Sequence, residues 1–179
     1  MELPKKINLK ECLEYIEKPP EENIQIFFDI NEKLKTFFNY KENIIEIYKE
    51  NAKIEYGKST IQDIEEDLRS QLVSYIQQGY KIFLFCGYYE YFDVLEFFGK
   101  LSWFSLDLFK NKNYLDKKFL LDSKILTENE DFDLTKTYKG GYKVHESARL
   151  YFLCGTSEEE IETFMKINSG LPLEVIIVE

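Results

Sequence analysis

Two stretches of the chain decide its fold: Lys81-Ile82-Phe83-Leu84-Phe85-Cys86-Gly87 and Arg149-Leu150-Tyr151-Phe152-Leu153-Cys154-Gly155. Aligned without gaps, they match in residue type at every position. Each is a short apolar run that ends at a glycine, which is typical of a strand buried on both faces. A helical pattern follows each run, so we expect strand-Gly-helix units in a mixed sheet. The predicted fold class is α/β, with α+β as the alternative.

The second unit continues into the last part of the sequence. Thr156 or Ser157 can cap a helix against Glu159 or Glu160. The residues from Leu173 to Val178 are predicted to form a closing strand. A β-α-β unit of this kind normally makes a right-handed parallel crossover.

The first third of the chain is predicted to be helical. Asn8 and Glu11 have the spacing of a capping box. Apolar residues from Ile24 to Phe38 recur mainly every three or four positions, which indicates a core-facing amphipathic helix. A second helix is expected from Glu42 to Asn51.

A boundary is expected near Gly57. It would divide the chain into a helical N-terminal region, residues 1–57, and an α/β core domain, residues 58–179. The clearest helix follows this boundary, with an apolar stripe from Ile61 to Ile76 and Gly79 at the left-handed C-terminal cap position.

The region between the two strand-Gly units has weaker patterns. A helix is predicted from Tyr88 to Gly99, and alternation from Phe104 to Leu108 indicates a half-exposed strand. Further short strands are expected at Phe119 to Leu121 and at Ile125-Leu126, and Gly140-Gly141 is expected to form a turn before Tyr142 to Val144.

Charge limits the classes of partner. The chain has 179 residues, of which 23 are basic and 33 acidic, for a net charge of -10. This charge disfavours direct binding to nucleic acid or to an anionic membrane, and it favours a basic protein partner. The sequence also lacks an N-terminal signal peptide and an apolar span long enough for a membrane helix, so a cytoplasmic protein is expected.

Three cysteines, Cys12, Cys86 and Cys154, form no CxxC pair, and their odd number does not indicate a disulfide framework. No glycine-rich phosphate-binding motif and no metal-ligand spacing is present, so no cofactor and no metal is predicted.

Four residues are candidates for catalysis: Cys86, Glu90, His145 and Cys154. The two cysteines are expected at the carboxyl ends of strands, where α/β sheets bind ligands. His145 is the only histidine and could serve as a general base. Against these roles, a cysteine at the end of a buried strand is usually core, and neither turn supplies a base or a cation that would activate it.

A family resemblance rests on two segments. The strand, glycine and helix of Phe83 to Phe98, followed by the segment from Glu159 to Gly170, resemble the phage and restriction-system branch of the ParB/sulfiredoxin-like domains. In that family a strand enters an Asp-Gly-x-x-Arg turn, and a later helix ends in an Ile-Asn-x-Gly-like motif. Ile167 begins the matching motif here.

The resemblance implies a set of site residues and also a departure from the family. Gly87 keeps the glycine of the turn, but Cys86 stands at the acidic position and Glu90 at the arginine position. A carboxylate there would repel the phosphate that an arginine holds, so the phosphoryl chemistry of the family is not expected. The predicted binding residues are Gly87, Tyr88, Tyr89, Asn168 and Gly170. The final β-α-β also resembles ferredoxin-like dimeric barrels, a likeness that assigns no activity.

These observations lead to three functional hypotheses. The first is a non-enzymatic acidic protein-binding module of the inhibitor, immunity or anti-defence type, which docks on a basic partner that itself binds nucleic acid. The second is a small enzyme with a site around Cys86 and Cys154, using thiol or ParB-like nuclease chemistry. The third is a purely structural or homo-oligomeric module built on an exposed edge strand such as Phe104 to Leu108.

Overall fold

A six-stranded sheet forms the centre of the molecule, with the strand order β1-β6-β2-β5-β4-β3. The computed structural model describes residues 5–18, 24–40, 43–88, 91–155 and 157–179. The strands are β1 (Lys5–Ile7), β2 (Ile24–Asp29), β3 (Ile44–Ile45), β4 (Lys81–Phe85), β5 (Arg149–Cys154) and β6 (Leu173–Val178). Every pair of neighbouring strands is parallel. The predicted α/β class is therefore confirmed, but the expectation of a mixed sheet is wrong.

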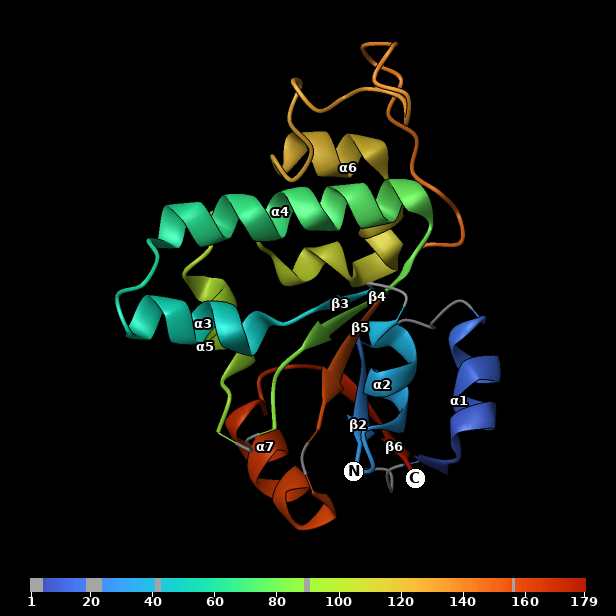
Figure 1. The fold of residues 1–179 in the computed structure, drawn as a ribbon, viewed down its shortest axis with the longest axis vertical. Helices are drawn as coiled ribbons and strands as arrows, with labels where there is room; N and C mark the ends of the chain where they lie inside the picture. Colours follow the sequence, from blue (N-terminus) through green and yellow to red (C-terminus); the bar gives the residue numbers. More distant parts are fainter. Residues whose placement is uncertain (1–4, 19–23, 41–42, 89–90, 156) are drawn as a thin grey trace.

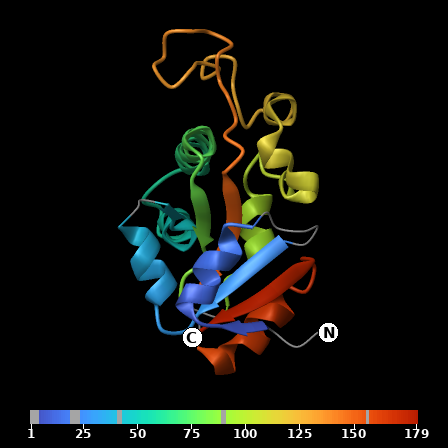
Figure 2. The ribbon, with the colours of Figure 1, turned by 90° about the vertical axis from the view of Figure 1, so that its right-hand side faces the viewer.

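Helices cover both faces of this sheet (Figures 1 and 2). The α-helices are α1 (Leu9–Ile16), α2 (Lys33–Asn39), α3 (Ile47–Glu55), α4 (Ile61–Gln78), α5 (Val94–Gly99), α6 (Lys117–Asp122) and α7 (Ile161–Ile167). The described residues also include the short 3-10 helices η1 (Leu106–Leu108), η2 (Lys110–Leu115) and η3 (Glu158–Glu160). No helix in the described ranges has both the length and the apolar character needed to cross a membrane.

Alternate residues of the strands enter two separate cores. The small core lies under α1 and α2 and includes Phe27, Phe38, Phe83, Tyr151 and Val178. The large core lies on the other face, under α4 to α7, and includes Phe28, Leu84, Phe97, Phe152 and Phe164. Because both faces are covered, the strands need no polar side, which explains their continuous apolar runs.

The predicted helix from Ile24 to Phe38 is wrong. Residues Ile24–Asp29 form β2, a strand in the middle of the sheet that is buried at every position. Only Lys33–Asn39 is helical. A short apolar run has the same composition in a doubly covered strand as in a buried helix, so spacing alone could not separate the two. The sheet thus takes strands from both sides of Gly57.

Three predicted short strands are also wrong. The segment Phe104 to Leu108 holds η1, and Phe119 to Leu121 lies in α6. Ile125-Leu126 is not part of a strand. The apolar side chains of these segments pack on the large core, so their spacing along the chain resembles the alternation of a half-buried strand. The edges of the described sheet are β1 and β3, so the edge strand expected for oligomerisation is not formed at Phe104 to Leu108.

Other predictions are confirmed. The capping box of Asn8 and Glu11 begins α1, and Gly79 ends α4 with a left-handed φ of 75°. The capping box of Ser157 precedes α7, and Leu173–Val178 is the closing strand. The first strand-Gly unit differs in one respect, because its helix starts only at Val94.

Candidate functional site

The fold itself points to one edge of the sheet. The chain leaves β2 into α2, on the small-core face, and it leaves β5 into η3 and α7, on the large-core face. These two strands are neighbours, with Phe28 beside Cys154. In open α/β sheets, ligands bind outside the carboxyl ends of two such strands, where the connections turn to opposite faces. We call this region the carboxyl edge.

The two similar stretches meet at the carboxyl edge. β4 and β5 pair in the same register in which their sequences align, from Lys81 beside Arg149 onward. The pairing continues past the strands, because the Gly155 N–H donates to the Gly87 carbonyl at 2.9 Å. The apparent repeat is therefore a pair of adjacent turns.

Aromatic rings lie directly on these turns. A Cβ atom added to Gly87 would lie 3.0 Å from the ring of Tyr48, and Gly87 has a left-handed φ of 101°. A Cβ atom on Gly155 would lie 2.7 Å from the ring of Tyr88. Both tyrosine rings also make edge contacts with Phe85, at 5.4 and 5.1 Å between centroids. Glycine is required at both turns because the rings occupy the space that a side chain would take.

Lys35 lies over the same rings. Its Nζ is 4.7 Å from the ring centroids of both Phe85 and Tyr88, and it donates a hydrogen bond to the Tyr88 hydroxyl. That hydroxyl donates in turn to Glu32 at 3.2 Å, and Glu46 lies 3.8 Å from Nζ. Burial acts to lower the pKa of Lys35, but these neighbours outweigh it and the pKa is raised. Lys35 is thus a charged group held by the protein's own side chains.

Asp29 ends β2 beneath this network and is 1% exposed. Its Oδ2 accepts a hydrogen bond from the Lys35 backbone N–H at 2.7 Å, whereas Oδ1 has no partner among the described residues. Burial raises the pKa of this carboxyl, and the N–H groups at the start of α2 oppose the rise. Asp29 therefore stabilises the β2–α2 turn through this hydrogen bond, while burial of its carboxylate in the ionised form costs free energy.

The two predicted thiols are sealed in the core. Cys86 is 2% exposed and Cys154 is 1% exposed. They contact each other, and burial together with the hydrogen bond that the Cys154 thiol donates to Cys86 raises the pKa of Cys154 well above its usual range. Burial also raises the pKa of Cys12, to about 12. A buried thiol of raised pKa is a poor nucleophile.

His145 lies far from the thiols. Its backbone N–H donates to the Ile76 carbonyl at the end of α4, and its Nδ1 is 2.8 Å from the Ser147 hydroxyl. These residues precede β5, so they lie at the amino edge of the sheet. A groove of about 780 Å³ passes beside His145. The structure thus brings two of the catalytic candidates together, Cys86 and Cys154, but not His145, and the fourth, Glu90, lies outside the described residues.

The predicted binding residues have different roles. Gly87 and Tyr88 belong to the carboxyl edge, and Tyr89 lies outside the described residues. Asn168 is completely buried, where it accepts from the Val94 N–H at 2.9 Å and donates to the Phe92 carbonyl at 3.0 Å. It therefore joins the end of α7 to the start of α5. Gly170 lies against Leu95.

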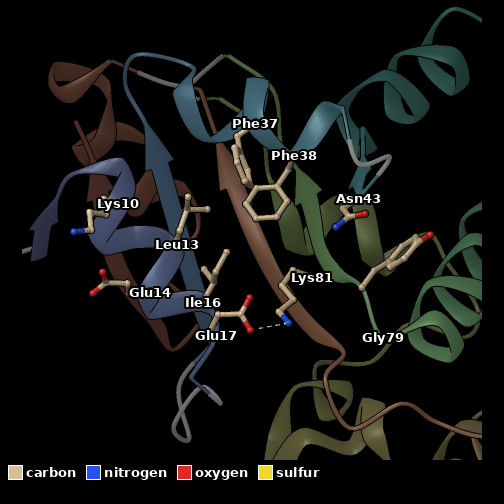
Figure 3. A pocket seen from close by; sticks show the side chains of 11 residues that line it. Lys10, Leu13, Glu14, Ile16, Glu17, Phe37, Phe38, Asn43, Gly79 and Lys81 are labelled. Atoms are coloured by element: carbon tan, nitrogen blue, oxygen red, sulfur yellow. Dashed lines mark ion pairs between the residues drawn. The ribbon is translucent and has the colours of Figure 1, made fainter.

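A separate groove of about 710 Å³ opens on the small-core face (Figure 3). Leu13 and Ile16 of α1 line one side, and Phe37 and Phe38 of α2 line the other. An ion pair of Glu17 and Lys81, 3.0 Å apart, spans it. The sequence did not predict this groove, since it depends on how far apart the two helices lie.

The sequence also did not predict a role for four residues of the carboxyl edge: Asp29, Lys35, Glu46 and Tyr48. Asp29 directly follows an apolar run, so assigning that run to a strand would have placed this carboxylate at the carboxyl edge. The other three depend on tertiary packing. Within the described ranges, no three His, Cys, Asp or Glu side chains are grouped so that they could hold a metal ion.

Comparison with known proteins adds no relative. No family model matches the chain, and neither does any curated protein or solved structure. The resemblance to ParB/sulfiredoxin-like domains therefore remains a hypothesis.

Proposed function

We propose that this protein is a non-enzymatic acidic binding module that docks on a basic protein partner. The docking surface is the α5–α7 face, which we define by Tyr91, Asp93, Leu95, Glu96, Glu159 and Glu162. The observation that carries the proposal is the exposure of two large apolar side chains among carboxylates. Tyr91 is 71% exposed and Leu95 is 38% exposed. An aromatic anchor ringed by charge is a common arrangement at protein interfaces.

The two helices of this face have a fixed relation. Asn168 bonds to the backbone on both sides of Asp93, which is itself the N-cap of α5. The contact of Gly170 with Leu95 lies next to these bonds. A surface already ordered before binding loses less conformational entropy when a partner docks.

Charge defines the kind of partner. Residues 91–100 and 157–170 contain six carboxylates and two lysines. One of these lysines, Lys100, pairs with Glu96 at 3.2 Å. With a net charge of -10 on the whole chain, a positively charged protein would be steered to this face, and the effect would weaken in salt.

The proposal extends to the type of partner. Acidic inhibitors can occupy nucleic-acid sites by matching phosphate charge, so an inhibitor, immunity or anti-defence protein of this kind would compete with nucleic acid on its target. The sealed thiols give no comparable support to the enzyme hypothesis, because a reactive thiolate must be accessible.

The test is affinity capture from host extract with the wild type and two matched variants. Tyr91→Ala removes the exposed ring of the face, and Tyr56→Ala removes a ring that is 76% exposed elsewhere. We expect wild type and Tyr56→Ala to retain the same basic partner at low salt, and Tyr91→Ala to lose it. Added nucleic acid should displace that partner. Capture that is equal for all three proteins, or that does not change with salt, would refute the proposal.

A further inference from the structure

The segment Phe132–Lys139 projects from the molecule beyond α6, and we call it the tip. Figures 1 and 2 both place this orange segment at the end of the long axis opposite to α7. Phe132 and Lys139 form an antiparallel bridge at its base. The tip and the α5–α7 face therefore lie at opposite ends of the molecule.

Hydrogen bonds give the tip a defined shape. Asp133 Oδ1 accepts from the backbone N–H groups of Thr137 and Tyr138, each at 2.7 Å. At the base, Gln77 of α4 donates to the Phe132 carbonyl at 2.8 Å. Lys117 of α6 pairs with Asp131 next to it, at 2.7 Å. The hydrogen bond from the Thr135 hydroxyl, followed by these backbone bonds, lowers the pKa of Asp133, so this carboxylate is ionised at neutral pH.

This ordered loop exposes two large side chains. Leu134 is 66% exposed and Tyr138 is 72% exposed. Apolar groups on a loop that already has its bound shape can bind at a low entropic cost. Large exposed apolar residues at a protruding position indicate an interaction site.

The charge of the tip is opposite to that of the α5–α7 face. The tip contains two lysines, Lys136 and Lys139, and one carboxylate, Asp133, and Lys143 follows it in the chain. The α5–α7 face has an excess of carboxylates around its own apolar pair. The tip thus has a net positive charge and the α5–α7 face a net negative charge, each beside exposed apolar side chains.

We propose that the tip of one copy docks on the α5–α7 face of a second copy. This inference rests on the proposed function, because it names a basic partner for the same face. The contact joins different surfaces on the two molecules, so it is heterologous, and repetition of it gives a ring or an open chain. Self-association would also cover the face until a competing basic protein displaces the tip.

Sedimentation velocity on the full chain tests this contact over a range of concentrations, at low and high salt. Wild type should form dimers and larger species as its concentration rises, and salt should reverse this. The tip variant carries Lys136→Ser and Tyr138→Ser, and the face variant carries Tyr91→Ser and Glu162→Gln. Each variant alone should remain monomeric. Mixed, they should form a one-to-one complex that does not grow, because only one intact tip and one intact face remain.

A Tyr56→Ser protein serves as the control and should associate like the wild type, since Tyr56 is exposed outside both surfaces. A wild type that stays monomeric at every concentration would overturn the inference. So would association that neither variant reduces. If affinity capture still depends on Tyr91 in either case, the proposed function stands and only the self-contact fails.

Discussion

The carboxyl edge and the tip differ in where their large side chains lie. At the carboxyl edge, where a sheet of this type would hold a ligand, the rings of Tyr48 and Tyr88 and the cation of Lys35 occupy the space above the strands. At the tip, backbone hydrogen bonds support the loop, and large side chains point into solvent. The side chains of the carboxyl edge contact one another, whereas those of the tip are exposed, so that a partner can contact them.

This difference shows how the two regions depend on their surroundings. The carboxyl edge depends on close packing, so small changes of volume should disturb it. The tip depends on a few polar anchors, so its exposed side chains should be replaceable without loss of the fold. Four experiments, from the largest expected effect to the smallest, test this contrast.

The largest effect is expected at the polar anchor that connects α4 to the chain leading to the tip. Arg69 has a side chain that is only 6% exposed, and it donates to the Ile125 carbonyl at 2.7 Å and to Glu130 at 3.0 Å. Arg69→Ala leaves Glu130 without its cation and should lower the free energy of unfolding by about 3–5 kcal/mol. Urea denaturation measures this, with Lys53→Ala as the control for an exposed pair. Equal effects of the two substitutions would show that the anchor is dispensable.

The two glycines of the carboxyl edge come next. Gly87→Ala must adopt a left-handed φ and also displace the Tyr48 ring, whereas Gly155→Ala only meets Tyr88. We expect losses of about 1–3 kcal/mol, with Gly87→Ala the larger. Gly99→Ala is the matched control, because nothing lies within 4 Å of an added Cβ there. Thermal unfolding of all three variants measures these losses. If the space beside the two turns of the carboxyl edge were open, all three variants would have the same stability.

Asp29 should give a smaller effect that depends on pH. Its pKa is raised in the folded state, so folding is favoured when the group is protonated, and stability is lost as the pH rises through the raised pKa. Asp29→Asn removes this cost but weakens the hydrogen bond from Lys35, so the net gain at neutral pH should not exceed about 1 kcal/mol. Urea midpoints at several pH values measure it. A gain that does not shrink towards about pH 3 would exclude burial of the charge as its cause.

The smallest effect is expected at the tip. Leu134→Ser replaces a side chain that is 66% exposed, so the free energy of unfolding should change by less than about 0.5 kcal/mol. A matched change in the core, Leu153→Ser, should cost several times more because Leu153 is fully buried. A large loss for Leu134→Ser in the same denaturation experiment would mean that the tip is part of the packed structure.

Local signals explain which parts of the fold could be predicted. Glycine after an apolar run identified β4 and β5, the apolar run at the end of the sequence identified β6, and a Ser or Asn placed before a Glu identified the starts of α1 and α7. The strand β2 was missed because its neighbours in the sheet come from distant parts of the chain, and its own residues fit a buried helix equally well. The intrinsic strand propensity of a residue has little weight where tertiary packing determines the secondary structure.

The candidate site was less predictable. The cysteines were correctly expected at the carboxyl ends of their strands, but they are sealed because both belong to the large core, whose packing brings together distant segments of the chain. Asn168 was selected from a motif, and in the structure it joins two helices. Neither outcome can be read from spacing, since both depend on contacts between distant segments.

The position of β2 has a consequence for how the protein is made. This strand emerges early during synthesis, yet its two partners, β5 and β6, are among the last segments to appear. Long-range parallel pairing is slow, and an unpaired strand as apolar as Ile24–Asp29 can associate with other chains in the meantime. The nascent chain must therefore keep its central strand protected until nearly all of the sheet exists, which makes β2 the expected binding segment for a holding chaperone.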